Sequence, residues 1–382
     1  MTKLKVFILL VSTCILGFSQ AKYETISSSI LGEDRELKIL LPRSYSNEDD
    51  KVYPVIYVLD GDYLFEPVAA NADFYAYWED IPEAIVVGIN QYDFRENDLI
   101  YSGQNSFPID TGAKFFEFVG KELIPYIENN YKAGNFKVAA GHGETANFIN
   151  YYLIRKTPVF NAYITISPDL APEMENYIGD RLKNLEKQVF YYLAVSNTDI
   201  KHIMQGAAAL NAIIKDIESD NLIYSFKEFE GASHYTMPAH AIPKALESIF
   251  YIFQPISKKE YKETILKLES SPVEYLQQKY NEIKLLFGID KQILINDFKA
   301  IAAAIKKNEK WEDFEALAKL AKANYPDTLL SNYYKGLYYE NIGEPKKAMK
   351  LYQSAYVLEE IGGISKDLLL EKAEQIKADF GY

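Results

Sequence analysis

Short, uninterrupted apolar segments alternate with longer segments of helical periodicity through the first two thirds of the chain. Apolar runs of this length, bounded by Asp, Gly or Pro, are typical of strands that are buried on both faces of a sheet. Residues 23–41 instead alternate polar and apolar positions, which is typical of antiparallel strands. This order of elements predicts a doubly wound, mostly parallel α/β sheet with right-handed connections. The predicted strands that follow cover residues 55–59, 84–89, 137–141, 162–168, 189–195 and 222–229, and the predicted helices cover 115–131, 147–156 and 204–217.

The character of the sequence changes after Pro255. From Lys258 onward Ala, Leu, Lys and Glu recur at helical spacing, and no segment has the pattern of a strand. At 382 residues the chain is also longer than one hydrophobic core usually organises. We therefore predict an α/β domain over residues 21–255 and an all-α domain over residues 256–382.

Part of the all-α domain has the residue spacing of a tetratricopeptide repeat. A second, looser copy lies upstream, between Trp311 and Pro326. Such repeats bury their faces by stacking, so one good and one poor copy favour a packed helical extension. A surface that docks a protein partner is the alternative. The six positions that match are Gly336, Tyr339, Gly343, Ala348, Tyr352 and Ala355.

The first twenty residues have the pattern of a secretory signal peptide. Lys3 and Lys5 precede an apolar run over residues 6–18, and small residues follow it. The run is too short for a typical membrane span. Cleavage near Gln20 and an exported, periplasmic or extracellular protein are expected. An uncleaved anchor, or a lipid on Cys14, is the lesser alternative.

Charge and composition exclude several classes of function. The formal net charge is −13, whereas nucleic acids and anionic membranes require a basic face. A single cysteine excludes a disulfide framework and a cysteine-based zinc site. Four histidines without a His-Glu-x-x-His spacing make metal catalysis a weak interpretation, so we expect no metal and no cofactor.

A strand, a sharp turn and a helix meet at Gly143. The sequence there is Gly141-His142-Gly143-Glu144-Thr145. In the nucleophile elbow of α/β-hydrolases, G-x-S-x-G, the third position is the serine that attacks the substrate. Here that position has no side chain, and Thr145 stands where the motif prefers a small glycine. The β-branch of Thr145 is expected to crowd the helix against the strand.

Four further blocks occur in order along the α/β domain, and together with the elbow they resemble the putative esterase family of α/β-hydrolases. The resemblance covers residues 23–253 and implies an α/β-hydrolase fold and hydrolysis of a small carboxylic ester through a serine acyl-enzyme. The blocks are residues 33–37 (EDREL), 57–62 (YVLDGD), 81–89 (IPEAIVVGI) and 121–127 (KELIPYI).

The resemblance also implies the remaining catalytic parts. His234, which follows the last predicted strand, matches the catalytic histidine of the family, and Asp199 matches the acid that orients it. Asn197 in the same loop is the other candidate for the acid. The oxyanion hole would use the backbone N–H groups of Glu144 and Asp62.

Without a hydroxyl at residue 143 the acyl-enzyme route lacks its nucleophile. Thr145 lies on the helix side of the turn and Ser233 on a different loop, so neither replaces it. We predict an exported esterase-like hydrolase whose activity is weak or lost. The alternative is a pseudo-enzyme that binds a ligand or a partner, and a water or metal nucleophile is a third, weaker option.

Two features near the expected site have a functional and a structural interpretation. Arg95 could bind a substrate carboxylate, but an ion pair with Glu96 or Asp98 on the surface is favoured. Four aromatic residues could stack on a substrate ring, but a buried packing cluster is favoured. They are Phe74, Tyr75, Tyr77 and Trp78.

Overall fold

The computed structural model describes residues 21–46 and 50–382. The predicted signal peptide, with Cys14, lies outside the described residues. The chain divides after Phe253 into two compact units. We call residues 21–253 the first unit and residues 254–382 the second unit.

The first unit is built on one eight-stranded sheet with the order β1-β2-β4-β3-β5-β6-β7-β8. β1 and β2, and β2 and β4, pair antiparallel, whereas every other neighbouring pair is parallel. The predicted fold class, a doubly wound and mostly parallel α/β sheet, is therefore confirmed. The strands are β1 (Lys22–Ser28), β2 (Glu33–Leu40), β3 (Tyr53–Val58), β4 (Ile85–Ile89), β5 (Ala133–His142), β6 (Ala162–Ile166), β7 (Val189–Ser196) and β8 (Leu222–Phe229).

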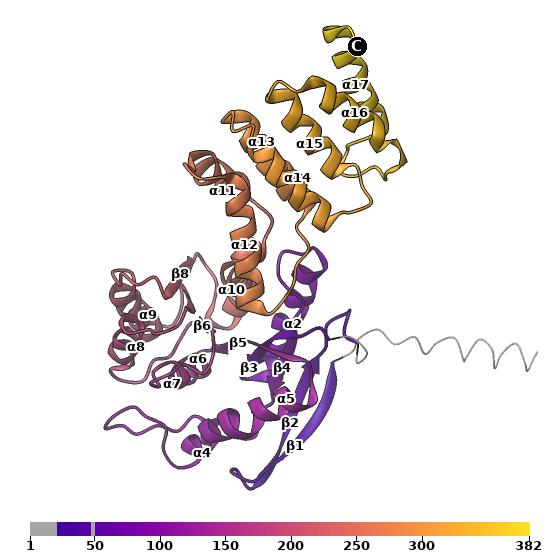
Figure 1. Ribbon diagram of the computed structural model, residues 1–382. Helices are drawn as coiled ribbons and strands as arrows, with labels where there is room; N and C mark the ends of the chain where they lie inside the picture. Colours follow the sequence, from indigo (N-terminus) through magenta and orange to yellow (C-terminus); the bar gives the residue numbers. More distant parts are fainter. Residues whose placement is uncertain (1–20, 47–49) are drawn as a thin grey trace, which may run out of the picture. The chain divides into compact units, whose positions relative to one another are not determined.

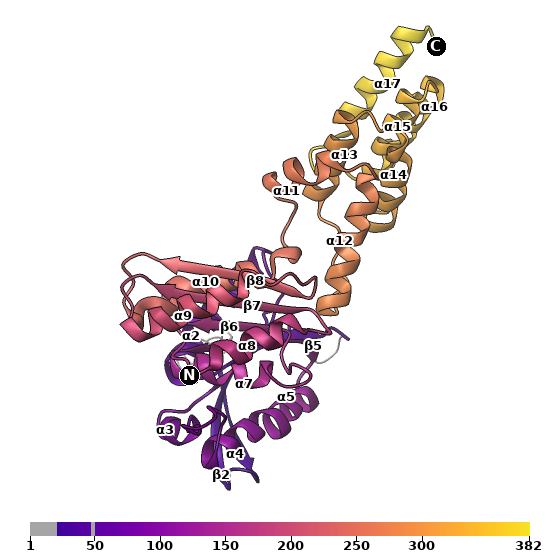
Figure 2. The same ribbon diagram turned by 90° about the vertical axis from the view of Figure 1, so that its left-hand side faces the viewer.

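Helices cover both faces of this sheet (Figure 1 and Figure 2). Val55 and Tyr57 of β3 belong to one apolar cluster with residues of α4 to α9, and the alternate residues Ile56 and Val58 are equally buried on the other face. α2 and α10 pack against each other and against the strands there. Because both faces are covered, the central strands are apolar throughout, as the sequence pattern requires. The helices are α2 (Gly61–Tyr77), α3 (Arg95–Asp98), α4 (Asp110–Phe118), α5 (Ile124–Asn130), α6 (Glu144–Phe148), α7 (Asn150–Leu153), α8 (Met174–Lys183), α9 (Lys201–Ile214) and α10 (Met237–Ile249).

The helix predicted over residues 115–131 is interrupted by a π-helical turn, η1 (Val119–Leu123). The N–H of Ile124 donates to the carbonyl of Val119, five residues earlier. Pro125 follows directly and has no N–H to donate to the carbonyl of Lys121. A wider turn at this point is a recognised way to absorb such a break.

The second unit consists of helices and short helical turns, so the predicted helical region is present. Successive helices from α14 to α17 pack against one another. Whether this stack is a tetratricopeptide array stays a prediction. The elements are α11 (Lys258–Glu263), α12 (Pro272–Phe287), α13 (Ile295–Lys307), α14 (Asp313–Asn324), α15 (Leu330–Asn341), α16 (Pro345–Ser354) and α17 (Lys366–Phe380).

Gly336 of α15 lies directly against the buried ring of Tyr352 of α16. A Cβ atom at residue 336 would lie 2.1 Å from Cε1 of Tyr352, which is closer than packed carbon atoms approach. We expect Gly336→Ala to lower the stability of the second unit by about 1–3 kcal/mol, because the ring cannot move without disturbing its neighbours. Urea denaturation followed by tryptophan fluorescence checks this, in a Trp78→Phe background where Trp311 alone reports on the second unit.

The matched control is Gly120→Ala in η1 of the first unit, where a Cβ would meet no atom within 4 Å. It is read in a Trp311→Phe background, where Trp78 alone reports on the first unit. That change is expected to be neutral, or stabilising by up to about 1 kcal/mol, since alanine favours helix over glycine. An unchanged urea midpoint for Gly336→Ala would contradict the prediction, because it would show that α15 and α16 can move apart without a loss of stability.

Candidate functional site

The turn between β5 and α6 holds Gly143 in a backbone conformation that side chains rarely adopt. Its φ is 62° and its ψ is −124°. The N–H of Gly143 donates to the carbonyl of Ile166 on β6 (3.0 Å), and its own carbonyl accepts from the N–H of Asp169 (3.0 Å). Gly141 is required here, because a Cβ atom would lie 2.5 Å from the carbonyl oxygen of Thr145. The turn therefore has the shape of a nucleophile elbow in which strand and helix approach closely.

His234 and Asp199 come together beside this turn. Asp199 follows β7, His234 begins the short helix η2 (His234–Thr236) after β8, and Nδ1 of His234 lies 2.9 Å from Oδ1 of Asp199. A Cβ atom at residue 143 would lie 3.5 Å from Nε2 of His234. The one side chain missing from the elbow would thus point at the free nitrogen of the histidine.

Hydrogen bonds fix the charge of Asp199 and the tautomer of His234. Burial alone would raise the pKa of Asp199, but hydrogen bonds from Ser167 Oγ, from the N–H of Ile200 and from His234 hold it below its usual value. An ionised carboxylate only accepts, so Nδ1 of His234 carries a proton, and in the neutral ring the lone pair is on Nε2. This is the state that a general base requires.

Asn197, the other candidate for the acid, is engaged elsewhere. Its Oδ1 accepts from the N–H of Gly231 (3.0 Å), which ties the loop after β7 to the loop that precedes His234. Sequence reasoning missed Ser167, whose hydroxyl donates to the second oxygen of Asp199. The only signal for Ser167 in the sequence is its place at the end of a predicted strand.

Arg95 binds two carboxylates at the elbow, and neither is a predicted partner. Its Nε lies 2.7 Å from Oδ1 of Asp60, and its Nη1 contacts the carboxylate of Glu144. The expected surface pair with Glu96 or Asp98 is wrong, because Asp98 is buried against Arg35 of β2 instead. Arg95 therefore joins the start of α2 to the start of α6.

Thr145 does not crowd the helix, contrary to expectation. Its side chain is fully buried, and Oγ1 lies 2.8 Å from Oδ2 of Asp60 and 2.9 Å from the carbonyl of His142. Oγ1 also accepts from the N–H of His142 (3.0 Å). Asp60 itself was overlooked as a site residue, although it lies in the quoted block of residues 57–62. It connects Thr145 to Arg95.

The two N–H groups expected to form an oxyanion hole both lie in first helical turns. Glu144 is the first residue of α6 and Asp62 the second residue of α2. N–H groups at these positions have no partner within their own helix. The side chain of Asp62 turns elsewhere, since Oδ2 accepts from the N–H groups of Gln91 and Tyr92.

A cleft of about 550 Å³ opens beside Arg95 and Glu144. Its size is that of a small-molecule site. Its walls combine two carboxylates, one guanidinium and two tyrosine rings with aliphatic side chains. The lining residues are Tyr92, Arg95, Glu96, Leu99, Ile100, Tyr101 and Glu144.

Comparison with known proteins supports the fold of the first unit. The family model described as Putative esterase matches residues 28–176. The chain is also similar to the crystal structure of an uncharacterised protein from Capnocytophaga ochracea DSM 7271, with 32% identity over 94% of this chain and 100% of that chain and a TM-score of 0.81. The chain belongs to the putative esterase family. No curated protein matches its sequence.

Two more distant structures share the fold of this esterase-like hydrolase. An IroE-like serine hydrolase from Shewanella oneidensis is 19% identical over 79% of this chain and 98% of that chain, with a TM-score of 0.59. The BES protein from Bacillus cereus is 24% identical over 62% of this chain and 97% of that chain, with a TM-score of 0.54.

The aromatic residues at the end of α2 in the esterase-like unit are not a buried cluster. Phe74, Tyr77 and Trp78 are 59%, 60% and 62% exposed, so the favoured interpretation was wrong. Tyr77 and Trp78 contact each other edge to face. The hydroxyl of Tyr75 donates to Glu247 of α10.

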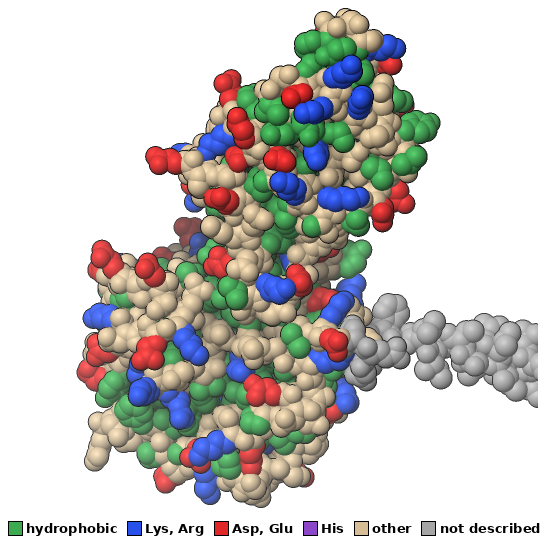
Figure 3. Space-filling model, viewed as in Figure 1, with side chains coloured by type: hydrophobic (Ala, Val, Ile, Leu, Met, Phe, Trp, Pro, Cys, Tyr) green, Lys and Arg blue, Asp and Glu red, His purple; other side chains and the backbone are tan. Residues whose placement is uncertain are grey.

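Charged side chains of both signs are interspersed on the face of the protein shown in Figure 3. Among residues 21–46 and 50–382, no group of three or more His, Cys, Asp or Glu side chains could hold a metal ion. Within the same ranges, no helix has the length and apolar character needed to cross a bilayer.

His142 packs its ring on His234, with ring centres 4.4 Å apart. Burial, together with the neighbouring His234, lowers the pKa of His142 to about 4. The ring is therefore neutral, and because Nε2 lies 3.0 Å from the carbonyl of His234, Nε2 carries the proton and donates it there. Nδ1 lies 3.0 Å from the hydroxyl of Tyr63. His142 thus holds the backbone of His234 in place.

This burial makes the stability of the esterase-like unit depend on pH. Below the ordinary pKa of 6.5 the unfolded chain protonates residue 142, whereas the folded protein stays neutral there until about pH 4. Stability is therefore lost as the pH falls from 6.5 to 4, by up to about 3 kcal/mol from this residue. We expect His142→Gln to remove that part of the pH dependence, measured as urea midpoints at pH 7 and pH 4.5. The exposed His240→Gln serves as the control and should keep the full dependence; an unchanged slope in His142→Gln would contradict the assignment.

Proposed function

We propose that the esterase-like unit binds a small carboxylic ester, or a molecule shaped like one, beside Gly143 and hydrolyses it weakly or not at all. One observation carries this proposal. A base and its orienting acid lie beside a sharp turn, 3.5 Å from where a Cβ atom would be, and the turn bears no side chain. In this proposal the site retains the groups that bind a substrate but lacks the hydroxyl that would attack it.

Each residue has a part in the proposal. His234 would be the base and Asp199 the acid that holds its tautomer, as in a serine hydrolase. The N–H groups of Glu144 and Asp62 would bind the carbonyl oxygen of the ligand, and they do not depend on any side chain at residue 143. Arg95 would hold the two helix starts together rather than bind substrate by itself, since two carboxylates already neutralise it.

Residual chemistry is limited by the missing hydroxyl. A water molecule in the space beside Nε2 could be activated by His234. In serine hydrolases that lack a triad member, roughly 10³–10⁴-fold acceleration over water remains from the oxyanion hole and binding. That is several orders of magnitude below ordinary turnover.

The test is covalent labelling of the purified full chain with a fluorophosphonate, read by intact-protein mass spectrometry, together with p-nitrophenyl butyrate hydrolysis. We expect no phosphonyl adduct and at most slow hydrolysis that His234→Ala abolishes. An adduct on any side chain, with ordinary turnover, would overturn the proposal.

A purely binding pseudo-esterase is the second candidate. The tetratricopeptide spacing in the second unit favours it, because such helices commonly hold a peptide or protein partner. A Gly143→Ser variant distinguishes the two candidates, because only an otherwise intact hydrolase should become active when serine is restored.

We also propose that the protein is exported to the periplasm or the exterior, on the signal-peptide pattern of residues 3–21. Sequencing the N-terminus of the mature protein tests this.

A further inference from the structure

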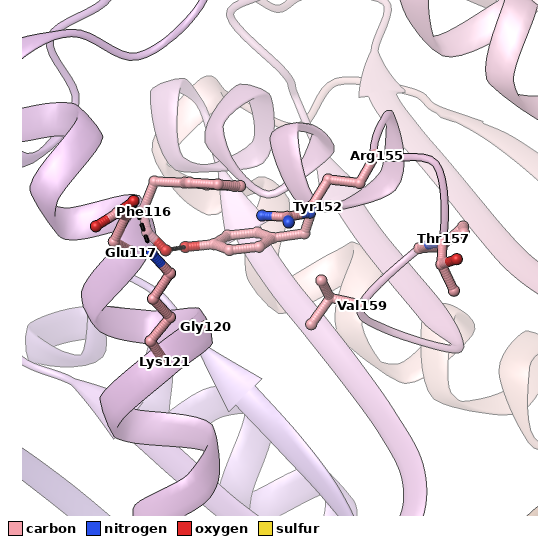
Figure 4. A pocket seen from close by; sticks show the side chains of 9 residues that line it. Phe116, Glu117, Gly120, Lys121, Tyr152, Arg155, Thr157 and Val159 are labelled. Carbon is pink, nitrogen blue, oxygen red and sulfur yellow. Dashed lines mark hydrogen bonds and ion pairs between the residues drawn. The ribbon is translucent and has the colours of Figure 1, made fainter.

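A second hollow lies in the esterase-like unit, next to the C-terminal end of α7 (Figure 4), whereas the elbow precedes α6. Its volume is about 350 Å³, enough for a ligand of one ring and a polar group. Its walls come from α4, η1 and α7 and from the loop that leads to β6. None of the residues that line it belongs to the site around Gly143.

One wall of this pocket is flat, aromatic and rigid. The rings of Phe116 and Tyr152 are stacked, with centres 4.5 Å apart and planes 20° apart. The hydroxyl of Tyr152 donates to the carbonyl of Phe116 (3.1 Å), and burial raises the pKa of Tyr152, so the phenol stays a donor. Pro158 and Val159 supply apolar surface on the side of the loop.

The charge at the rim of the pocket is positive. The guanidinium of Arg155 lies over the ring of Phe116, 5.5 Å from its centre, and Figure 4 shows it pointing toward the stacked rings. Within the described part of the chain no carboxylate forms an ion pair with Arg155, whose guanidinium contacts the ring of Phe116 instead. Lys121 is already paired with Glu117 (2.9 Å). An unpaired guanidinium beside an aromatic face is suited to bind a carboxylate with two parallel hydrogen bonds.

Gly120 leaves the pocket open, and the fold gives no other reason for a glycine there. It lies in the π-helical turn η1, its φ is not positive, and a Cβ atom would meet nothing within 4 Å. Neither backbone conformation nor packing therefore requires glycine, which weakens a helix. Because Gly120 lines the pocket, a larger side chain at residue 120 would fill part of its space. π-helical turns are also frequent at functional sites.

We propose that this pocket binds a small aromatic carboxylate of the size of benzoate. The ring lies against the apolar walls made by Phe116 and Val159, and the carboxylate accepts hydrogen bonds from Arg155. The pocket is a site separate from Gly143, and its occupancy does not require ester hydrolysis.

Titration of the full chain with 4-fluorobenzoate, followed by ¹⁹F NMR, tests the proposal. We expect saturable binding that Arg155→Gln weakens at least tenfold and that Gly120→Leu abolishes. Lys156→Gln removes a neighbouring exposed cation outside the pocket and should leave the affinity unchanged. The neutral probe 4-fluorobenzamide should bind at least tenfold more weakly than the carboxylate.

The same titrations test whether the pocket is independent of the proposed ester site around Gly143. His234→Ala should bind 4-fluorobenzoate like the native chain, because the two sites share no residue. Absence of saturable binding, equal affinity in Arg155→Gln and the native chain, or loss of binding in His234→Ala would each overturn the proposal. Thermal melting of each variant confirms folding, and Gly120→Leu should melt no lower than the native chain, so that lost binding reports on the pocket.

Discussion

Gly143→Ser is expected to convert the protein into an active esterase. A serine Cβ at this position lies 3.5 Å from Nε2 of His234, which places its hydroxyl within reach of the histidine's free lone pair. The carboxylate of Asp199 and the turn already lie beside His234, so only the hydroxyl is added. Because loss of the serine from a working triad costs roughly 10⁶-fold in kcat, we expect p-nitrophenyl butyrate hydrolysis to rise by at least about a hundredfold.

The matched control for this variant is Gly143→Ala. Both substitutions put a Cβ atom on a residue with φ of 62°, so both should destabilise the fold by about 1–3 kcal/mol. Only serine brings an oxygen, so only Gly143→Ser should gain activity and label with a fluorophosphonate. The double variant Gly143→Ser, His234→Ala should lose the gain. A folded but inert Gly143→Ser would favour the pseudo-esterase that only binds.

Asp98→Ala is expected to cause the largest loss of stability, about 3 kcal/mol, because it removes the buried carboxylate of the pair and leaves the buried guanidinium of Arg35 with Glu33, which is 39% exposed, as its remaining counter-charge. Arg35 and Asp98 are each 2% exposed in their side chains and are joined by two hydrogen bonds of 2.7 and 2.6 Å. Arg35 also lies over the ring of Phe94, 4.0 Å from its centre. Thermal and urea denaturation of the full chain measure the loss.

The chain offers a matched control in Arg43 and Asp73, which form the same two-bond pair at the surface. Their side chains are 56% and 35% exposed. Asp73→Ala should cost under about 1 kcal/mol, since water solvates the arginine that remains. The double variant Arg35→Met, Asp98→Leu should be more stable than Asp98→Ala, because it buries neither charge of the pair. Equal losses for Asp98→Ala and Asp73→Ala would show that burial of the pair does not matter.

Asp98 also bears on the site, because α3 carries both Asp98 and Arg95 within four residues. The buried pair ties α3 to β2, while Arg95 on the same short helix contacts Asp60 and Glu144. A helix this short has little stability of its own. The position of Arg95 at the elbow thus depends on an ion pair made by a strand 63 positions earlier in the chain.

Local pattern was sufficient for the fold and the family. Apolar runs such as residues 55–58 predict strands that are covered on both faces of the sheet. Successive side chains of a strand point to opposite faces, so a strand that is buried on both faces is apolar at every position. Gly141 and Gly143 mark the elbow because a close helix–strand approach and a positive φ each favour glycine. The roles of His234 and Asp199 remain predictions, although the structure places Nδ1 of His234 2.9 Å from Oδ1 of Asp199.

The ion-pair partners of Arg95 and the burial of the aromatic side chains depend on contacts between segments that are distant in the sequence. Glu96 and Asp98 are nearest to Arg95 in sequence, yet its carboxylates come from residues 60 and 144, because the ends of parallel strands meet at one edge of the sheet. The exposure of Phe74, Tyr77 and Trp78 likewise depends on what packs over the end of α2, which no local pattern contains. The sequence by itself determined which apolar runs form strands, the family and the absence of a hydroxyl at residue 143. Only the tertiary structure decided which charges pair, which rings are covered and where the second pocket opens, because these depend on contacts between residues far apart along the chain.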